Sequence, residues 1–291
     1  MRPMQEPDLA DVRHVTDAAF AGIIGQMTGR TVATPVMPPL LFSTRFAADP
    51  AGCWVAADGV TGEIVGAIFS IARGTLGWFG PLAVSPTVQG QGVGRALIAA
   101  CFAGLRGRGV RLVGLETFAE SPFHVRLYSR FGFRPSWTGL GLRRKIEPVR
   151  MPAGVTTDGP VPNLDFVYAG LDVGAEAVMV ARSAVGTAFV TEGGIAICHF
   201  APTFEGAGTG FLPFVAASSR PAFDRLLDAA EHACGERGLG VLAVRVSGSA
   251  WQTFDRLAGR GYRPERAEIR MKLGERPDYD AAAIFYADSW L

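Results

Sequence analysis

The sequence has no long apolar run, no excess of either charge and few lysines. Its 28 basic and 27 acidic residues leave a formal net charge of +1, so no strong field attracts nucleic acid or an anionic membrane. Lysine occurs only as Lys145 and Lys272. No segment has the roughly 18–20 uninterrupted apolar residues that a membrane-spanning helix needs. We therefore expect a protein that binds neither nucleic acid nor a membrane.

Paired cysteines are absent as well. The four cysteines form no C-x-x-C motif: Cys53, Cys101, Cys198 and Cys234. This spacing disfavours the common zinc sites and a disulfide framework, so we expect no metal and a cytoplasmic location. The first residues, Met1–Asp8, carry charges where a signal peptide would begin its apolar core. With 48% apolar and 19% charged residues, the chain is too hydrophobic to remain unfolded.

The length of 291 residues is about twice that of a typical domain. The first half predicts strands and helices in the order βββαβαβ, at 53–57, 63–72, 78–84, 92–107, 111–118, 122–131 and 133–146. Three adjacent strands before the first helix are typical of an antiparallel meander. The pattern indicates an α+β fold, with a mixed, mostly antiparallel sheet flanked by helices.

The same order returns in the second half. Residues 79–84 (FGPLAV) align with 211–216 (FLPFVA) at an offset of 132, and 132–135 (GFRP) align with 261–264 (GYRP) at an offset of 129. A helix is predicted at 220–236 and a strand at 241–246. Two copies of one fold explain this repeat. We predict domains at 1–148 and 163–291, the second with a C-terminal tail, joined by a Pro- and Gly-rich linker at 149–162.

A glycine-rich turn stands between a predicted strand and the helix at 92–107. It reads Gln89-Gly90-Gln91-Gly92-Val93-Gly94-Arg95. Glycine costs chain entropy, so such a run is expected where the backbone must turn tightly and expose its N–H groups. A helix N-terminus adds unsatisfied N–H groups and the positive end of a dipole, which favour a phosphate. A Rossmann turn would need a further glycine at Arg95, and a P-loop would need Gly-Lys-Ser/Thr, so both are disfavoured.

Three segments together resemble the GCN5-related N-acetyltransferase superfamily: Leu82-Ala83-Val84-Ser85-Pro86, Gln89-x-x-Gly92-x-Gly94-x-Ala96-Leu97 and Leu127-Tyr128-x-x-x-Gly132-Phe133. The resemblance covers roughly residues 2–146 and implies two tandem domains of that fold. It also implies acetyl-coenzyme A as the co-substrate. Two strand residues would then meet pantetheine, and the turn would surround the diphosphate: Leu82 and Val84, then Gln89, Gly90, Gln91, Gly92, Val93, Gly94 and Arg95.

The resemblance further implies acetyl transfer to a primary amine by direct attack on the thioester. Tyr128 matches the family tyrosine that gives a proton to the coenzyme A sulfur, and a phenol with a pKa of about 10 is protonated at neutral pH. Glu116 takes the place of a glutamate base found in some members. His124 and a water chain are the alternatives for the base. The expected acceptor is a small-molecule amine or a protein N-terminus.

The second copy looks degenerate in the same alignment. It places Pro221 on Gln89, Ala222 on Gly90, Asp224 on Gly92 and Leu226 on Gly94, and Leu257 replaces Tyr128. We therefore expect one active site per chain, in the first domain. The alternative to an enzyme is a non-catalytic acyl-coenzyme A sensor or scaffold. The sequence leaves the acceptor, the acyl preference and the oligomeric state open.

Overall fold

The computed structural model describes residues 1–201, 205–274 and 284–289. They group into two compact units, Met1–Leu115 and Glu116–Leu291. The division falls within strand β5 (Leu112–Phe118), earlier in the chain than the predicted linker at 149–162.

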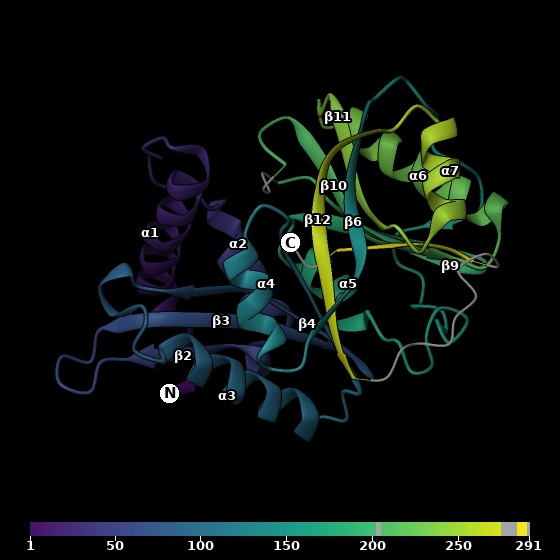
Figure 1. Ribbon diagram of the computed structural model, residues 1–291. Helices are drawn as coiled ribbons and strands as arrows, with labels where there is room; N and C mark the ends of the chain where they lie inside the picture. Colours follow the sequence, from purple (N-terminus) through teal and green to yellow (C-terminus); the bar gives the residue numbers. More distant parts are fainter. Residues whose placement is uncertain (202–204, 275–283, 290–291) are drawn as a thin grey trace. The chain divides into compact units, whose positions relative to one another are not determined.

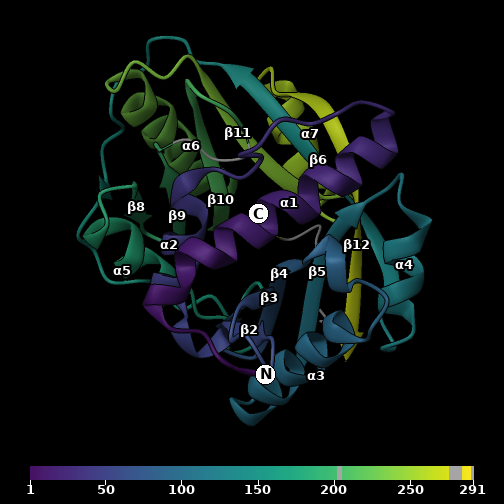
Figure 2. The ribbon, with the colours of Figure 1, turned by 90° about the vertical axis from the view of Figure 1, so that its left-hand side faces the viewer.

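The first unit is a twisted sheet with helices on both faces. Its strands are β1 (Arg2–Pro3), β2 (Trp54–Ala57), β3 (Ile64–Arg73), β4 (Leu76–Val84) and the start of β5. Its helices are α1 (Leu9–Thr28), α2 (Pro39–Ala48) and α3 (Val93–Gly107), with short 3-10 turns at Glu6–Asp8, Pro50–Gly52 and Pro86–Val88. The strands follow the order β1-β2-β3-β4-β5. Neighbours are antiparallel except β4 and β5, which are parallel. Helices α1 and α2 lie on one face and α3 on the other (Figure 1, Figure 2).

Helix α3 packs through the apolar positions that its sequence repeats every four residues. Leu97, Cys101 and Leu105 are buried, as a helix with one apolar face requires. Gly77 of β4 lets the helix and the following segment approach closely, because a Cβ there would come within 2.9 Å of Val110 and 3.3 Å of Leu105.

The second unit contains the remaining elements. Its strands are β6 (Arg134–Lys145), β7 (Val155–Thr156), β8 (Gly186–Thr191), β9 (Gly194–His199), β10 (Thr209–Ala217), β11 (Val241–Ser247), β12 (Arg263–Gly274) and β13 (Phe285–Asp288). Its helices are α4 (Pro122–Ser129), α5 (Gly174–Arg182), α6 (Arg220–Gly235) and α7 (Trp251–Gly259). The sheet order is β12-β6-β11-β10-β9-β8-β7, and β13 also pairs with β10.

Strand β6 explains why the division precedes the predicted linker. The sequence repeat makes β6 the last strand of the first copy. In the structure it lies between β11 and β12 and is antiparallel to both (Figure 1). The second unit therefore contains a strand that the sequence assigns to the first copy.

The predicted fold class is confirmed: the sheets are mixed and mostly antiparallel, and helices flank them. The predicted strands and helices between 53 and 146 match β2 to β6, α3 and α4 within two residues at each end. Helices α1, α2 and α5 were not predicted. Within the described part of the chain, no helix is both long enough and apolar enough to cross a membrane.

Replacing Gly114 by alanine is expected to destabilise the first unit by about 1–3 kcal/mol, the usual cost of overpacking a core. A Cβ at Gly114 would lie 2.7–2.9 Å from ring atoms of Trp78, which is 2% exposed. The matched control is Gly107→Ala in α3, where a Cβ meets nothing within 4 Å. Alanine favours the helix there, so this variant should be neutral or slightly stabilised. Urea unfolding midpoints test the pair, and equal midpoints would contradict the tight contact.

Candidate functional site

The glycine-rich turn follows β4 and the 3-10 turn Pro86–Val88. Gly90 and Gly92 have φ angles of 81° and 88°, in the left-handed region that favours glycine. A Cβ at either position would meet nothing within 4 Å. The glycines are therefore needed for backbone conformation and not for space.

The turn presents backbone N–H groups at the start of α3. The N–H of Ala96 donates to the carbonyl of Gly92 at 3.0 Å, so the N–H groups of Val93, Gly94 and Arg95 precede the first intrahelical bond. No side chain of the described residues caps this helix. Residues 89–92 and Arg95 are exposed. An uncapped and exposed helix N-terminus with glycines before it suits an anion.

Strand β4 has one edge that β5 covers only in part. Parallel pairing with β5 involves Leu76, Gly77 and Trp78, whereas antiparallel pairing with β3 extends to Val84. The N–H of Ser85 donates to the carbonyl of Val65 at 2.8 Å. Because hydrogen-bonded residues alternate along an antiparallel pair, the backbone groups of Leu82 and Val84 point away from β3. Both predicted pantetheine contacts therefore lie on the edge opposite β3.

The side chain of Gln89 links the turn to that edge. Its Nε2 donates to the carbonyl of Val84 at 3.0 Å. This contact joins the glycine-rich turn to the end of β4.

The connection between strand and helix in the second copy differs from the glycine-rich turn more than the alignment predicted. Strand β10 ends at Ala217 and α6 begins at Arg220, so Ser218 and Ser219 alone connect them. The turn is shortened, which corrects the predicted residue-by-residue replacement. The Ser219 hydroxyl accepts a hydrogen bond from the N–H of Ala222 at 3.4 Å and caps the helix. Asp224 in the first turns of α6 is ion-paired to Arg256 at 2.6 Å.

Tyr128 lies on the inner side of α4. It is 7% exposed, its ring centroid is 6.3 Å from that of Phe133, and its ring stacks on that of His124 at 6.4 Å. Burial raises the pKa of the Tyr128 phenol, which keeps the hydroxyl protonated at neutral pH. Burial lowers the pKa of His124, so its ring is uncharged there. Its Nδ1 lies 2.6 Å from the Ser121 hydroxyl.

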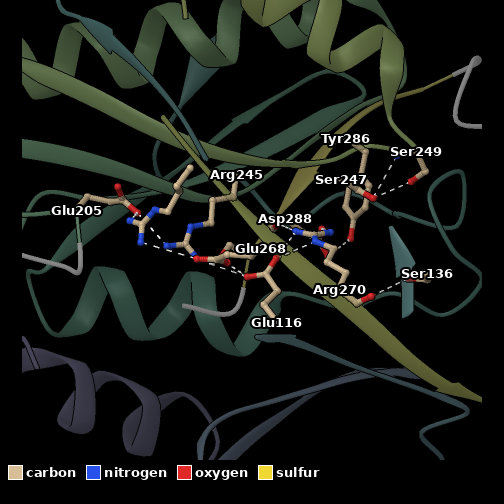
Figure 3. Close-up of polar contacts among 12 residues, drawn as sticks. Glu116, Ser136, Glu205, Arg245, Ser247, Ser249, Glu268, Arg270, Tyr286 and Asp288 are labelled. Atoms are coloured by element: carbon tan, nitrogen blue, oxygen red, sulfur yellow. Dashed lines mark hydrogen bonds and ion pairs between the residues drawn. The ribbon is translucent and has the colours of Figure 1, made fainter. Parts of the chain in front are cut away.

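Glu116 is part of a cluster of buried charges (Figure 3). Its Oε1 accepts a hydrogen bond from Arg270 Nε at 2.7 Å, and Arg245 Nη1 lies 3.5 Å from its Oε2. The Ser289 hydroxyl donates to the same Oε2 at 3.4 Å. The side chains of Glu116, Arg245 and Arg270 are each 2% exposed. Both oxygens of Glu116 are therefore engaged by donors.

The two arginines extend this cluster to three more carboxylates. Arg270 binds both the carboxylate and the carbonyl of Asp288. Arg245 pairs with Glu268 at 2.9 Å and with Glu205 at 3.1 Å. Burial raises the pKa of Glu268 to about 7, and the Glu116 charge adds to this while Arg245 opposes it.

This cluster of buried charges was not predicted from the sequence, although the sequence contains a pattern that indicates it. Arg266, Glu268 and Arg270 alternate along β12, and alternate residues of a strand share one face. Charges repeated on a face that is otherwise buried indicate ion pairs inside the protein. The partner Glu116 lies far away in the sequence, so pairing could not be read from the pattern.

Residues 49–135 match the family model of the acetyltransferase (GNAT) domain. That range includes the turn, Glu116 and Tyr128. A stretch of 78 residues is 44% identical to a mycothiol acetyltransferase of Cellulomonas flavigena. The match covers 27% of this chain and 19% of that relative, so most of its length has no counterpart in the match.

Solved structures extend the likeness to nearly the whole chain. A putative acetyltransferase from Pyrococcus horikoshii is similar with a TM-score of 0.72 and 16% identity, over 99% of this chain and 93% of its own. A tandem GNAT protein from the clavulanic acid biosynthesis pathway has a TM-score of 0.53 and 15% identity, over 96% of this chain and 98% of its own. At such identities the similarity shows the fold and not the reaction.

Glu268→Gln is expected to gain stability relative to the wild type as the pH rises. The folded-state pKa of Glu268 is about 7, above its ordinary 4.5, so the folded protein holds this proton more tightly. The resulting stabilisation is complete below the unfolded pKa and is lost as the pH rises through the folded pKa. Glutamine mimics the protonated carboxyl of Glu268. The variant therefore keeps this stabilisation at every pH in the range.

Urea midpoints between about pH 4.5 and pH 8 measure this effect. Glu265→Gln, at a glutamate whose side chain is 57% exposed, is the control and should follow the wild type. A difference between Glu268→Gln and the wild type that is constant over this range would contradict the assignment.

Proposed function

We propose that this chain, whose residues 49–135 match the acetyltransferase (GNAT) domain model, transfers an acetyl group from acetyl-coenzyme A to a primary amine. The observation that carries the proposal is the uncapped, exposed start of α3, with Gly90 and Gly92 in left-handed conformations before it. Such a turn binds a diphosphate through backbone N–H groups without any Cβ in the way.

The edge of β4 suits the rest of the coenzyme. Pantetheine carries two amides in an extended arm, and the backbone groups of Leu82 and Val84 point away from β3. An extended ligand can pair with such an edge as an added strand would. We assign Leu82 and Val84 to pantetheine and residues 89–95 to the diphosphate, with the exposed Arg95 adding a positive charge.

The chemistry needs two proton movements. A neutral amine attacks the thioester carbonyl, a C–N bond forms, and the C–S bond then breaks to release a thiolate. We propose that Tyr128 gives its hydroxyl proton to this thiolate. Burial raises the pKa of the phenol, and a thiolate that leaves within the same dry environment also becomes a stronger base.

Two residues compete as the base that takes the ammonium proton. Glu116 has the family position, and contacts with Arg270 and Arg245 hold its carboxylate in place. His124 is uncharged at neutral pH because burial lowers its pKa, and it can therefore accept a proton directly. We retain Glu116 as the predicted base and His124 and water as the alternatives.

The acceptor is proposed to be a small-molecule amine or a protein N-terminus. Release of thiol from acetyl-coenzyme A is measured with pooled small amines and with N-terminal peptides. Release that depends on a pool supports the enzyme. Coenzyme binding without release in any pool would instead support the alternative, a sensor or scaffold.

Gly92→Asp is expected to weaken acetyl-coenzyme A binding by about tenfold or more. A side chain at φ 88° costs roughly 1–2 kcal/mol, and a carboxylate repels the diphosphate. Each 1.4 kcal/mol is about tenfold in affinity. The matched control is Gly62→Asp in the β2–β3 connection, where φ is 75° and a Cβ also meets nothing within 4 Å. Titration calorimetry compares them, and equal losses of affinity in both variants would contradict the assigned turn.

Tyr128→Phe is expected to lower kcat by about 10²–10⁴-fold, the usual contribution of a positioned acid. Coenzyme affinity should stay near the wild-type value, because the assigned binding contacts are elsewhere. Tyr262→Phe is a control at another buried tyrosine, whose hydroxyl donates to Glu231 at 2.8 Å. It should lower stability and leave kcat unchanged. Wild-type turnover in Tyr128→Phe would remove this residue from the mechanism.

A further inference from the structure

The short C-terminal strand β13 lies on a particular edge of β10. Its residues Phe285–Asp288 are antiparallel to Phe214–Ala217. The N–H of Ser218 donates to the carbonyl of Gly193 at 2.8 Å, so alternation along the β9–β10 pair directs the backbone groups of Val215 and Ala217 away from β9. The N–H of Ser289 donates to the carbonyl of Pro213 at 2.7 Å in the same series. Strand β13 therefore pairs with the edge of β10 that faces away from β9.

This edge is the counterpart of the open edge of β4. Each strand has a parallel neighbour, and pairing begins with Leu76 opposite Leu112 in one unit and Thr209 opposite Val241 in the other. Leu82 is six residues after Leu76, and Val215 is six residues after Thr209. Counted in this way, Val84 matches Ala217, which is one residue out of step with the sequence repeat, where Phe214 and Ala216 align with Leu82 and Val84. The correspondence is therefore between the two strand edges and not between individual residues.

Both strands also lose their parallel neighbour before these residues. The β4–β5 pairs extend to Trp78, and the β10–β11 pairs extend to Leu212. Each strand shifts its register against its antiparallel neighbour close to this point. The second copy thus has the same opening in its sheet as the first, and β13 fills it.

Side chains hold β13 in this position. Arg270 binds the carboxylate and the carbonyl of Asp288, and the Tyr286 hydroxyl donates to the same carboxylate at 2.6 Å. The N–H of Tyr286 donates to the Thr253 hydroxyl at 2.9 Å. The Phe285 ring stacks on Phe223 of α6 at 5.3 Å between centroids. Strand β13 thus pairs with β10 along one edge and also contacts side chains of α6 and α7. These contacts fix its position.

We propose that the second copy retains the strand-edge slot of its fold as a binding site for a peptide strand, and that residues Phe285–Asp288 of the chain itself occupy it. The comparison with pantetheine rests on the proposed function, which assigns the matching edge of β4 to that ligand. The peptide site itself is supported by contacts within the second unit alone. Backbone pairing gives the affinity, and the Arg270–Asp288 ion pair selects the occupant.

The test uses a chain that ends at residue 283 and a fluorescent peptide with the sequence of residues 284–289. The peptide should bind the shortened chain, as measured by fluorescence anisotropy, and should not bind the full chain, whose slot is filled. A peptide carrying Asp288→Asn should bind about tenfold more weakly or worse, because Arg270 then loses a charged partner. A scrambled peptide is the control. Binding is measured without coenzyme or amine, so it does not depend on whether acetyl transfer occurs.

Equal binding of the peptide to the full and the shortened chain would overturn the proposal, and so would its failure to bind a folded shortened chain. If the shortened chain does not fold, hydrogen exchange in the full chain decides. The Phe285 and Ala287 amides, which face β10 in the register, should exchange at least about tenfold faster in Asp288→Asn, while α3 amides keep their wild-type rates. Unchanged exchange at these amides would overturn the proposal.

Discussion

The backbone of a strand edge must find hydrogen-bond partners, and this requirement connects the two halves of the molecule. In each unit a central strand loses its parallel neighbour part of the way along, at Trp78 in β4 and at Leu212 in β10. In the second unit β13 supplies the partners. In the first unit the Gln89 side chain binds the carbonyl of Val84, and we propose that pantetheine amides serve the remaining groups. In these two proposals, the same geometric feature serves a coenzyme in one copy and a peptide strand in the other.

The buried charges of the second unit bear on both proposals. Arg270 contacts Glu116 and Asp288 together, so a single guanidinium links the predicted base to the strand that fills the slot. Buried ion pairs cost much desolvation energy and persist only when nearly all partners are present. A change at Asp288 would thus alter the charge balance around Glu116 without touching it. A Glu116 variant can therefore lower activity by destabilising the second unit. Its stability must be measured beside its kinetics before the loss of activity is attributed to proton transfer.

Local patterns were enough to predict much of the fold. Apolar residues at every fourth position indicate α3, and the local strand pattern at 53–57 and 63–72 predicted β2 and β3. Helix α1 carries Gly22 and Gly25 and a weak apolar face, so its periodicity gave little signal. The location of β6 between β11 and β12 depends on pairing between distant segments, which no local pattern encodes. The predicted C-terminal tail contains the strand Phe285–Asp288, while Tyr279 and Trp290 lie outside the described residues.

The second copy keeps the strand edge of the fold and has a shortened connection in place of the glycine turn. A surface connection can be shortened at little cost in stability, and Ser218 and Ser219 are all that join β10 to α6. A strand edge cannot be shortened in this way, because removing it would remove part of the sheet. Without β13, the edge of β10 beyond Leu212 would present unpaired N–H and C=O groups. The extended backbone of Phe285–Asp288 satisfies these groups, in the way that we propose pantetheine satisfies those of β4.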